Sequence, residues 1–153
     1  MLNNEIHIIY GSQPLRMIKE ILAAINLASE LDKDMKIALK PNLVLARPAR
    51  DGATTSPLIV EGIIQYFWEH NLKNITIMEG SWVGDKTSRA FKLCGYEDIS
   101  KKYGIPLIDL QKDGFQNVKA GDLNLKICNK VLETDYLINI PVLKAHCQTL
   151  FTC

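Results

Sequence analysis

The sequence has little of what marks nucleic-acid-binding, membrane or secreted proteins. Lys and Arg total 18 against 17 for Asp and Glu, so the net charge of +1 gives no electrostatic reason to expect nucleic acid or an anionic membrane as a partner. Apolar runs are short and interrupted, and none approaches the ~20 residues that a membrane-spanning helix needs. The first residues lack a basic stretch followed by an apolar core, which argues against a secretory signal and favours a cytoplasmic protein.

Cysteine is also sparse, and its spacing matches no common metal motif. The four cysteines, Cys94, Cys128, Cys147 and Cys153, form neither a CxxC pair nor the tight spacing of a ferredoxin cluster. We therefore predict no metal site from the cysteine pattern. Cys94 and Cys128 are expected to be buried or free thiols in a reducing compartment. Cys147 and Cys153 are left unassigned, because His146 adjoins Cys147 and could supply a metal ligand or an acid-base group.

The composition and periodicity predict one α/β domain. With 47% hydrophobic and 23% charged content over 153 residues, the chain resembles an ordinary domain with its own core. β-Branched segments alternate with segments whose apolar residues recur every three or four positions. Strands are predicted at residues 5–10, 35–39, 74–78, 105–110 and 136–140, and helices at 14–30, 57–68 and 86–93. This alternation implies right-handed crossovers, and hence a three-layer architecture with a mainly parallel sheet and helices on both faces.

Three local patterns refine this prediction. Residues 115–127 alternate apolar and polar side chains around Gly121, which predicts one antiparallel hairpin near the C-terminal third. Residues 136–140 form an almost continuous apolar run, as expected for a strand buried on both faces. Ser56 and Pro57 are typical of a helix N-cap followed by a first-turn proline.

Polar residues gather after the predicted strands, where open parallel sheets bind ligands. The candidate ligand-binding residues are Lys40, Asn42, Thr55, Ser56, Glu79, Ser81, Lys144 and His146. Two ammonium groups, together with hydroxyls at a helix N-terminus, favour a phosphate or carboxylate as the ligand. Each residue also has an ordinary explanation, such as a solvated lysine at a strand end, or turn formation and capping by Asn42 and Ser56.

The motifs at these positions resemble a known family. They are Lys40-Pro41-Asn42-Leu43-Val44, Thr54-Thr55-Ser56-Pro57, Glu79-Gly80-Ser81 and Leu137-Ile138-Asn139-Ile140-Pro141-Val142-Leu143-Lys144-Ala145-His146. In order and spacing they resemble domain of unknown function family 362. The resemblance implies an α/β domain, found mainly in bacteria and archaea, whose own reaction is not established. It also implies an association with iron-sulfur proteins, because the family is often joined to a ferredoxin-like module.

The chain departs from the family pattern in three places. It ends after Gln148-Thr149-Leu150-Phe151-Thr152-Cys153 where the family continues, it lacks the cluster cysteines, and Val142 replaces a common lysine. We therefore expect residues 1–153 to form a single α/β domain, the N-terminal part of a longer family domain. An iron-sulfur cluster is expected in longer members of the family, and this chain offers no ligand motif for one.

Three interpretations follow from the sequence. In the first, the chain is a binding or redox-accessory module that holds a small anionic ligand or a partner's loop, with the cluster in a ferredoxin-like domain or partner. In the second, it is an enzyme in which Lys40 or Lys144 fixes a carboxylate or phosphate substrate and His146 or Glu79 moves a proton. In the third, it is an inactive fragment that self-associates through an exposed strand edge or apolar patch. Substrate and reaction are left open.

Overall fold

A four-stranded parallel sheet forms the centre of the molecule. The structure is a computed structural model and describes residues 5–146 and 150–152. The strands are β1 (Ile37–Pro41), β2 (Ile75–Glu79), β3 (Leu107–Asp109) and β6 (Tyr136–Ile140), in the order β3-β2-β1-β6. β1 is central, since Ile37 pairs with Ile75 on one side and with Tyr136 on the other. The predicted mixed α/β architecture with a parallel sheet is confirmed.

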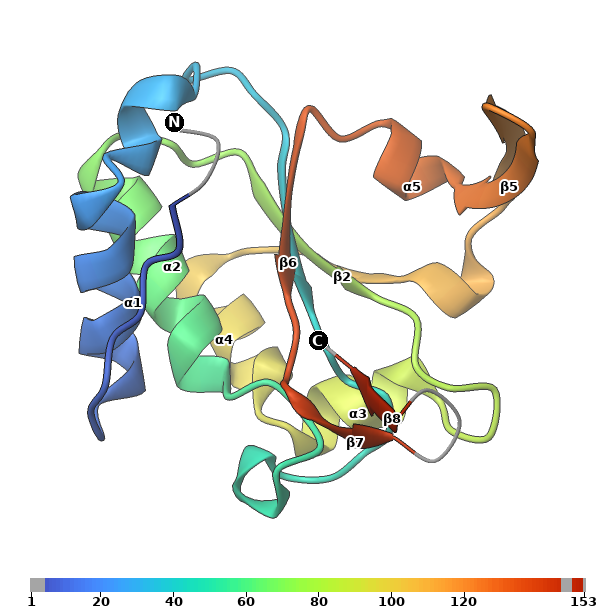
Figure 1. The fold of residues 1–153 in the computed structure, drawn as a ribbon, viewed down its shortest axis with the longest axis horizontal. Coiled ribbons are helices and arrows are strands. Elements are labelled where there is room, and N and C mark those ends of the chain that lie inside the picture. The colour runs from blue at the N-terminus through green and yellow to red at the C-terminus, as the bar shows by residue number, and fades with distance from the viewer. Residues whose placement is uncertain (1–4, 147–149, 153) are drawn as a thin grey trace.

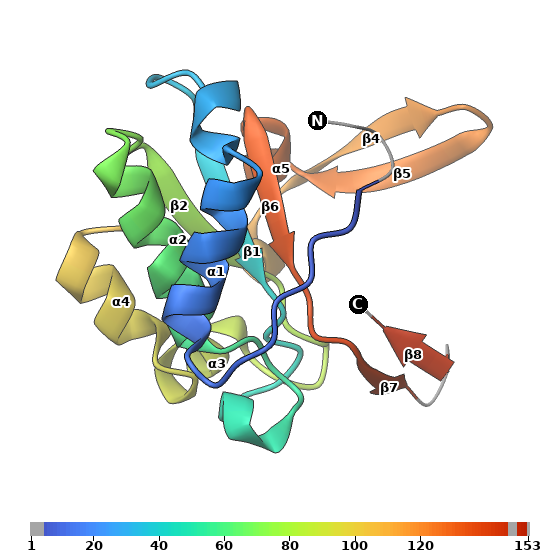
Figure 2. The ribbon, with the colours of Figure 1, turned by 60° about the vertical axis from the view of Figure 1, so that its left-hand side comes forward.

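Helices lie on both faces of the sheet (Figures 1 and 2). The helices are α1 (Pro14–Ala24), α2 (Pro57–Glu69), α3 (Thr87–Leu93), α4 (Tyr96–Tyr103) and α5 (Asn129–Leu132). α1, α2 and α4 cover one face, whereas the short α5 stands over the other face with the β4-β5 hairpin beside it. In the described part of the chain, none of these helices is long and apolar enough to cross a membrane.

The hydrophobic core lies between the sheet and the α1, α2 and α4 layer. It is built from alternate residues of β1 and β2, such as Leu39 and Ile77, packed with Ile64 and Phe67 of α2, and all four are fully buried. α1 approaches α2 closely at Gly62, where an added Cβ would lie 2.5 Å from the Ile18 side chain. The alternate apolar residues of the strands therefore pack against the apolar residues that recur every three or four positions in the helices, as the two patterns predict.

Two antiparallel hairpins stand apart from the main sheet. β4 (Phe115–Ala120) pairs with β5 (Leu123–Cys128), as the alternation predicts, with Gly121 at the turn in the left-handed region at φ 58°. β7 (Lys144–His146) pairs with β8 (Leu150–Thr152) at the carboxyl end of β6. This second hairpin was not predicted, because its strands are three residues each and carry no clear alternation.

Two predictions about strands are wrong. Residues 5–10 form no strand, and Ile6 and Tyr10 are 87% and 91% exposed. β-Branched residues supply only a local preference, and in the described part of the chain no neighbouring strand pairs with this segment. The strand at 136–140 forms as β6 but is not buried on both faces. It lies at the edge of the sheet, and Leu137 is 43% exposed.

Several boundaries also differ from the prediction. The first helix ends at Ala24, because Asn26 adopts the left-handed conformation at φ 50° and a 3-10 turn (Leu27–Glu30) follows. Ser56 precedes α2 as predicted, but its side chain makes no capping hydrogen bond. α4 and α5 were not predicted.

Candidate functional site

The carboxyl ends of β1, β2 and β6 open into a cavity of about 410 Å³. Its lining residues are Lys40, Asn42, Val44, Glu79, Gly80, Trp82, Asn139, Pro141, Lys144, His146 and Thr152. Five of the eight candidate residues therefore come together here, namely Lys40, Asn42, Glu79, Lys144 and His146. The parallel register explains the meeting, since it places the last residues of β1 and β6 side by side, with Lys40 opposite Asn139.

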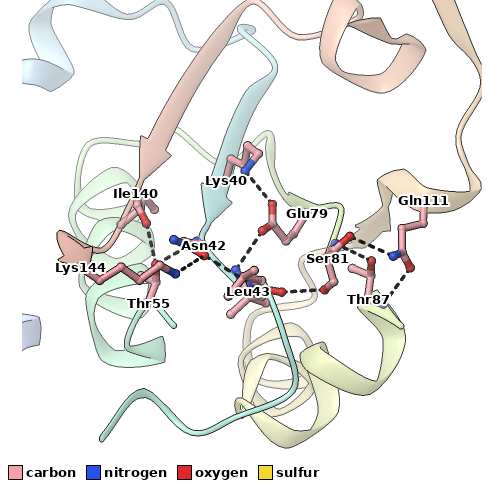
Figure 3. Close-up of polar contacts among 11 residues, drawn as sticks. Lys40, Asn42, Leu43, Thr55, Glu79, Ser81, Thr87, Gln111, Ile140 and Lys144 are labelled. Carbon is pink, nitrogen blue, oxygen red and sulfur yellow. Dashed lines mark hydrogen bonds and ion pairs between the residues drawn. The ribbon is translucent and has the colours of Figure 1, made fainter. Parts of the chain in front are cut away.

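A buried carboxylate forms the floor of this site. Glu79 is 3% exposed, and its Oε2 lies 2.7 Å from Nζ of Lys40, whose side chain is 35% exposed. The other oxygen, Oε1, accepts a hydrogen bond of 2.9 Å from the Leu43 N–H (Figure 3). Both oxygens are thus engaged, and the carboxylate ties the end of β2 to the segment after β1.

Lys144 reaches into the site from β7. Its Nζ donates to the carbonyl oxygen of Ala53 at 2.7 Å. It also donates to Oδ1 of Asn42 at 3.3 Å (Figure 3). Burial lowers the pKa of the Lys144 ammonium from its ordinary value, and the nearby negative charge of Glu79 opposes that shift. Asn42 is itself fixed, because its Oδ1 also accepts from the Val44 N–H.

The three remaining candidate residues do not line the cavity. The Thr55 hydroxyl is buried behind it, where it accepts from the Asn42 N–H at 2.9 Å and donates to the Ile140 carbonyl at 2.6 Å. Ser81 donates from its hydroxyl to the Leu43 carbonyl at 2.7 Å. Ser56 lies outside the lining as well. Thr55 and Ser81 therefore hold the loops that shape the cavity.

Six lining residues were not among the candidates: Val44, Gly80, Trp82, Asn139, Pro141 and Thr152. Asn139 carried a usable signal, since it is the polar residue in the otherwise apolar β6. Trp82 directly follows the Glu79-Gly80-Ser81 motif and could have been added on position alone. Thr152 carried no signal, because it reaches the site through the β7-β8 pairing.

The charge balance of the cavity suits an anion. Lys40 and Lys144 contribute two positive charges and Glu79 one negative charge, which leaves +1 with His146 counted as neutral. The Glu79 carboxylate is already held by Lys40 and Leu43. Lys144 bonds only to neutral carbonyl oxygens in the described part of the chain, so its charge is available to a ligand.

The described residues do not fit an iron-sulfur cluster. Within residues 5–146 and 150–152, no three His, Cys, Asp or Glu side chains gather as metal ligands. Cys94 is buried and donates from its thiol to the Arg47 carbonyl, and burial raises the pKa of that thiol, which disfavours the thiolate that a metal requires. Cys128 is half-buried, and like Cys94 it is a free thiol, as predicted. Cys147 and Cys153 lie outside the described residues.

Comparison with known proteins and family models shows to which family the chain belongs. The family model described as domain of unknown function (DUF362) matches residues 37–153, from the first residue of β1 onward. The chain belongs to this family. No curated protein and no solved structure matches it. The DUF362 match contains every residue that lines the cavity, whereas α1 and the segment before it precede the matched region.

Proposed function

We propose that this DUF362 protein binds a small molecule through an anionic group, carboxylate or phosphate, in the cavity at the strand ends. The meeting of Lys40 and Lys144 in one cavity carries the proposal. These residues are 104 positions apart in the chain and come from different elements, β1 and β7. Structural needs alone do not explain why two cations converge around one buried carboxylate, because Lys40 already neutralises Glu79.

Lys144 is the main anion-binding group in this proposal. Its bonds to Ala53 and Asn42 engage two of its three N–H donors in the described part of the chain, which leaves a third for the ligand. Because the ammonium is already positioned, the ligand does not bear the entropy cost of ordering it. Partial burial further strengthens its attraction for a negative charge.

A Lys144→Met variant tests the proposal. A hydrogen bond to a charged group is worth about 1.5–3 kcal/mol, so affinity for a phosphate monoester or monocarboxylate is expected to fall roughly 10- to 150-fold. Ligands are first selected from a panel of such compounds by thermal shift, and affinities are then measured by calorimetry. Lys119→Met, at an exposed position on β4, is the matched control and should bind like the parent protein. If no compound of the panel stabilises the protein, the proposal is wrong.

Alkaline pH should weaken binding earlier than an ordinary lysine would allow. The ammonium is charged below its pKa, and burial lowers the Lys144 pKa from 10.5, so affinity for an anion is lost as pH rises through that lowered value. Sulfate is the suitable probe, because its charge stays constant between about pH 7 and pH 10.5. A Lys144→Arg variant keeps its charge over this range and should show a flatter profile. Identical profiles for lysine and arginine would contradict the assignment.

Catalysis at the same site is the second candidate function. Glu79 and His146 line the cavity together with both lysines, so a bound carboxylate or phosphate compound would lie near two groups capable of proton transfer. In this alternative the lysines fix the substrate, and His146 or Glu79 moves the proton. Conversion of a compound selected from the panel, followed by nuclear magnetic resonance, separates an enzyme from a binding module.

The proposal also includes a redox partner, a ferredoxin-like domain or protein that carries the iron-sulfur cluster. The family resemblance associates such domains with ferredoxin-like modules, and the described residues of this chain gather no ligand set for a cluster. In this proposal the chain supplies the ligand site, and a ferredoxin-like domain or partner carries the cluster.

A further inference from the structure

A solvent-exposed tryptophan stands at the wall of the cavity. Trp82 lines the cavity together with Lys40 and Lys144, yet 61% of the residue is exposed. It follows Ser81 in the loop between β2 and α3. Such an exposed indole contributes little to the core, so its position needs another explanation.

The loop that carries Trp82 is fixed by many hydrogen bonds. The Trp82 N–H donates to the Val44 carbonyl at 3.0 Å, which joins this loop to the one after β1. The side chain of Gln111 donates to the carbonyls of Ser81 and Asp85 at 3.0 Å each, and Figure 3 shows its contact with Ser81. The Asp85 carboxylate accepts from the Ala46 N–H at 2.8 Å. These bonds hold the backbone on both sides of Trp82.

The indole ring lies against the backbone of its own loop. A Cβ added at Gly84 would lie 1.8 Å from Cζ3 of Trp82, so the ring lies directly against the backbone of that glycine. A side chain at position 84 would displace the ring. Trp82 therefore lies against Gly84 and presents an exposed aromatic surface beside two ammonium groups.

We propose that the ligand of this cavity carries a planar conjugated group beside its anionic group and stacks that group on Trp82. This inference rests on the proposed anion site and adds the class of ligand. Aromatic walls with a few converging polar groups are typical of small-molecule pockets, and the cavity of about 410 Å³ has the size of such a pocket. The anionic group meets Lys144 and Lys40, while the planar group covers exposed indole surface.

Two matched pairs of ligands test the stacking. The first pair is adenosine 5′-monophosphate and ribose 5-phosphate, and the second is benzoate and cyclohexanecarboxylate. Within each pair the two compounds share the same anionic group, and only the first contains an aromatic ring. Stacking on an aromatic side chain corresponds to about a 5- to 150-fold gain in affinity, which is the expected advantage of the aromatic member in at least one pair.

Variants assign that advantage to Trp82. All affinities are measured by calorimetry in a Trp68→Phe protein. Trp82 is then the remaining tryptophan, so in the proteins that keep it, quenching of its fluorescence gives a second signal for ligand binding near the ring. In Trp82→Ala the two members of a pair should bind alike, whereas Trp82→Phe should keep part of the aromatic advantage. Val83→Ala is the control, because Val83 is 92% exposed and is not among the lining residues.

The outcomes separate this inference from the function on which it rests. Equal affinities within both pairs, unchanged by Trp82→Ala, would overturn the stacking and leave the anion site standing. If inorganic phosphate, acetate and all four paired compounds fail to bind the Trp68→Phe protein, both the anion site and the stacking are overturned. An aromatic advantage that disappears in Trp82→Ala and survives in Val83→Ala supports both.

Discussion

Replacing Glu79 with alanine is expected to lower the free energy of unfolding by about 2–4 kcal/mol. The carboxylate is 3% exposed and accepts from the Leu43 N–H, so its removal leaves a buried donor without an acceptor. It also leaves Lys40 without its ion-pair partner. Because the Lys40 side chain is 35% exposed and can turn to water, we place the cost below that of breaking a fully buried pair.

A Glu79→Gln variant separates the two parts of this effect. Its amide oxygen can still accept from Leu43 and its volume is almost the same, so a loss of only about 1–2 kcal/mol is expected. Urea unfolding of both variants, compared at equal slope, measures the difference. If glutamine costs as much as alanine, the ion pair with Lys40 and not the Leu43 hydrogen bond holds the end of β2. No loss in either variant would contradict the geometry of the site.

The sequence predicted the sheet well where local pattern and long-range pairing agree. α2 combines a first-turn proline with a broad apolar stripe, and β1 and β2 carry alternate residues that fit the core, so each forms close to the predicted bounds. α4 was missed because it buries only Tyr96 and Ile99, which is too short a stripe to stand out among charged neighbours. The segment at 5–10 shows the opposite failure, since a strand requires a partner that local pattern does not supply.

The position of the site could be predicted, but the direction of each side chain could not. Parallel strands bring their carboxyl ends to one edge, and that rule alone places Lys40, Asn42 and Glu79 together. Whether a hydroxyl in a following loop faces the cavity or the protein depends on the path of that loop. Thr55 and Ser81 turn toward backbone carbonyls, so they support the site from behind instead of lining it.

Thr55 provides the second large expected effect. Thr55 is 2% exposed, and its hydroxyl joins two strand ends by accepting from the Asn42 N–H and donating to the Ile140 carbonyl. A Thr55→Val variant keeps the shape of the side chain and removes both bonds. The half-buried Asn42 N–H and the buried Ile140 carbonyl then both lose the hydroxyl as a partner, and we expect a loss of about 2–4 kcal/mol in the free energy of unfolding.

A Thr55→Ser variant is the matched control, because it keeps the hydroxyl and loses one methyl group, at an expected cost of about 1 kcal/mol. Urea unfolding gives both values.

The same pair of Thr55 variants tests how the site is built. Asn42 meets Lys144 at the cavity, and its backbone is held by Thr55, so the valine variant should also bind an anion more weakly than the serine variant does. A valine variant as stable as the serine variant would show that the strand ends are held by packing alone. A stability loss without any change in affinity would show instead that Asn42 keeps its position without the Thr55 hydroxyl.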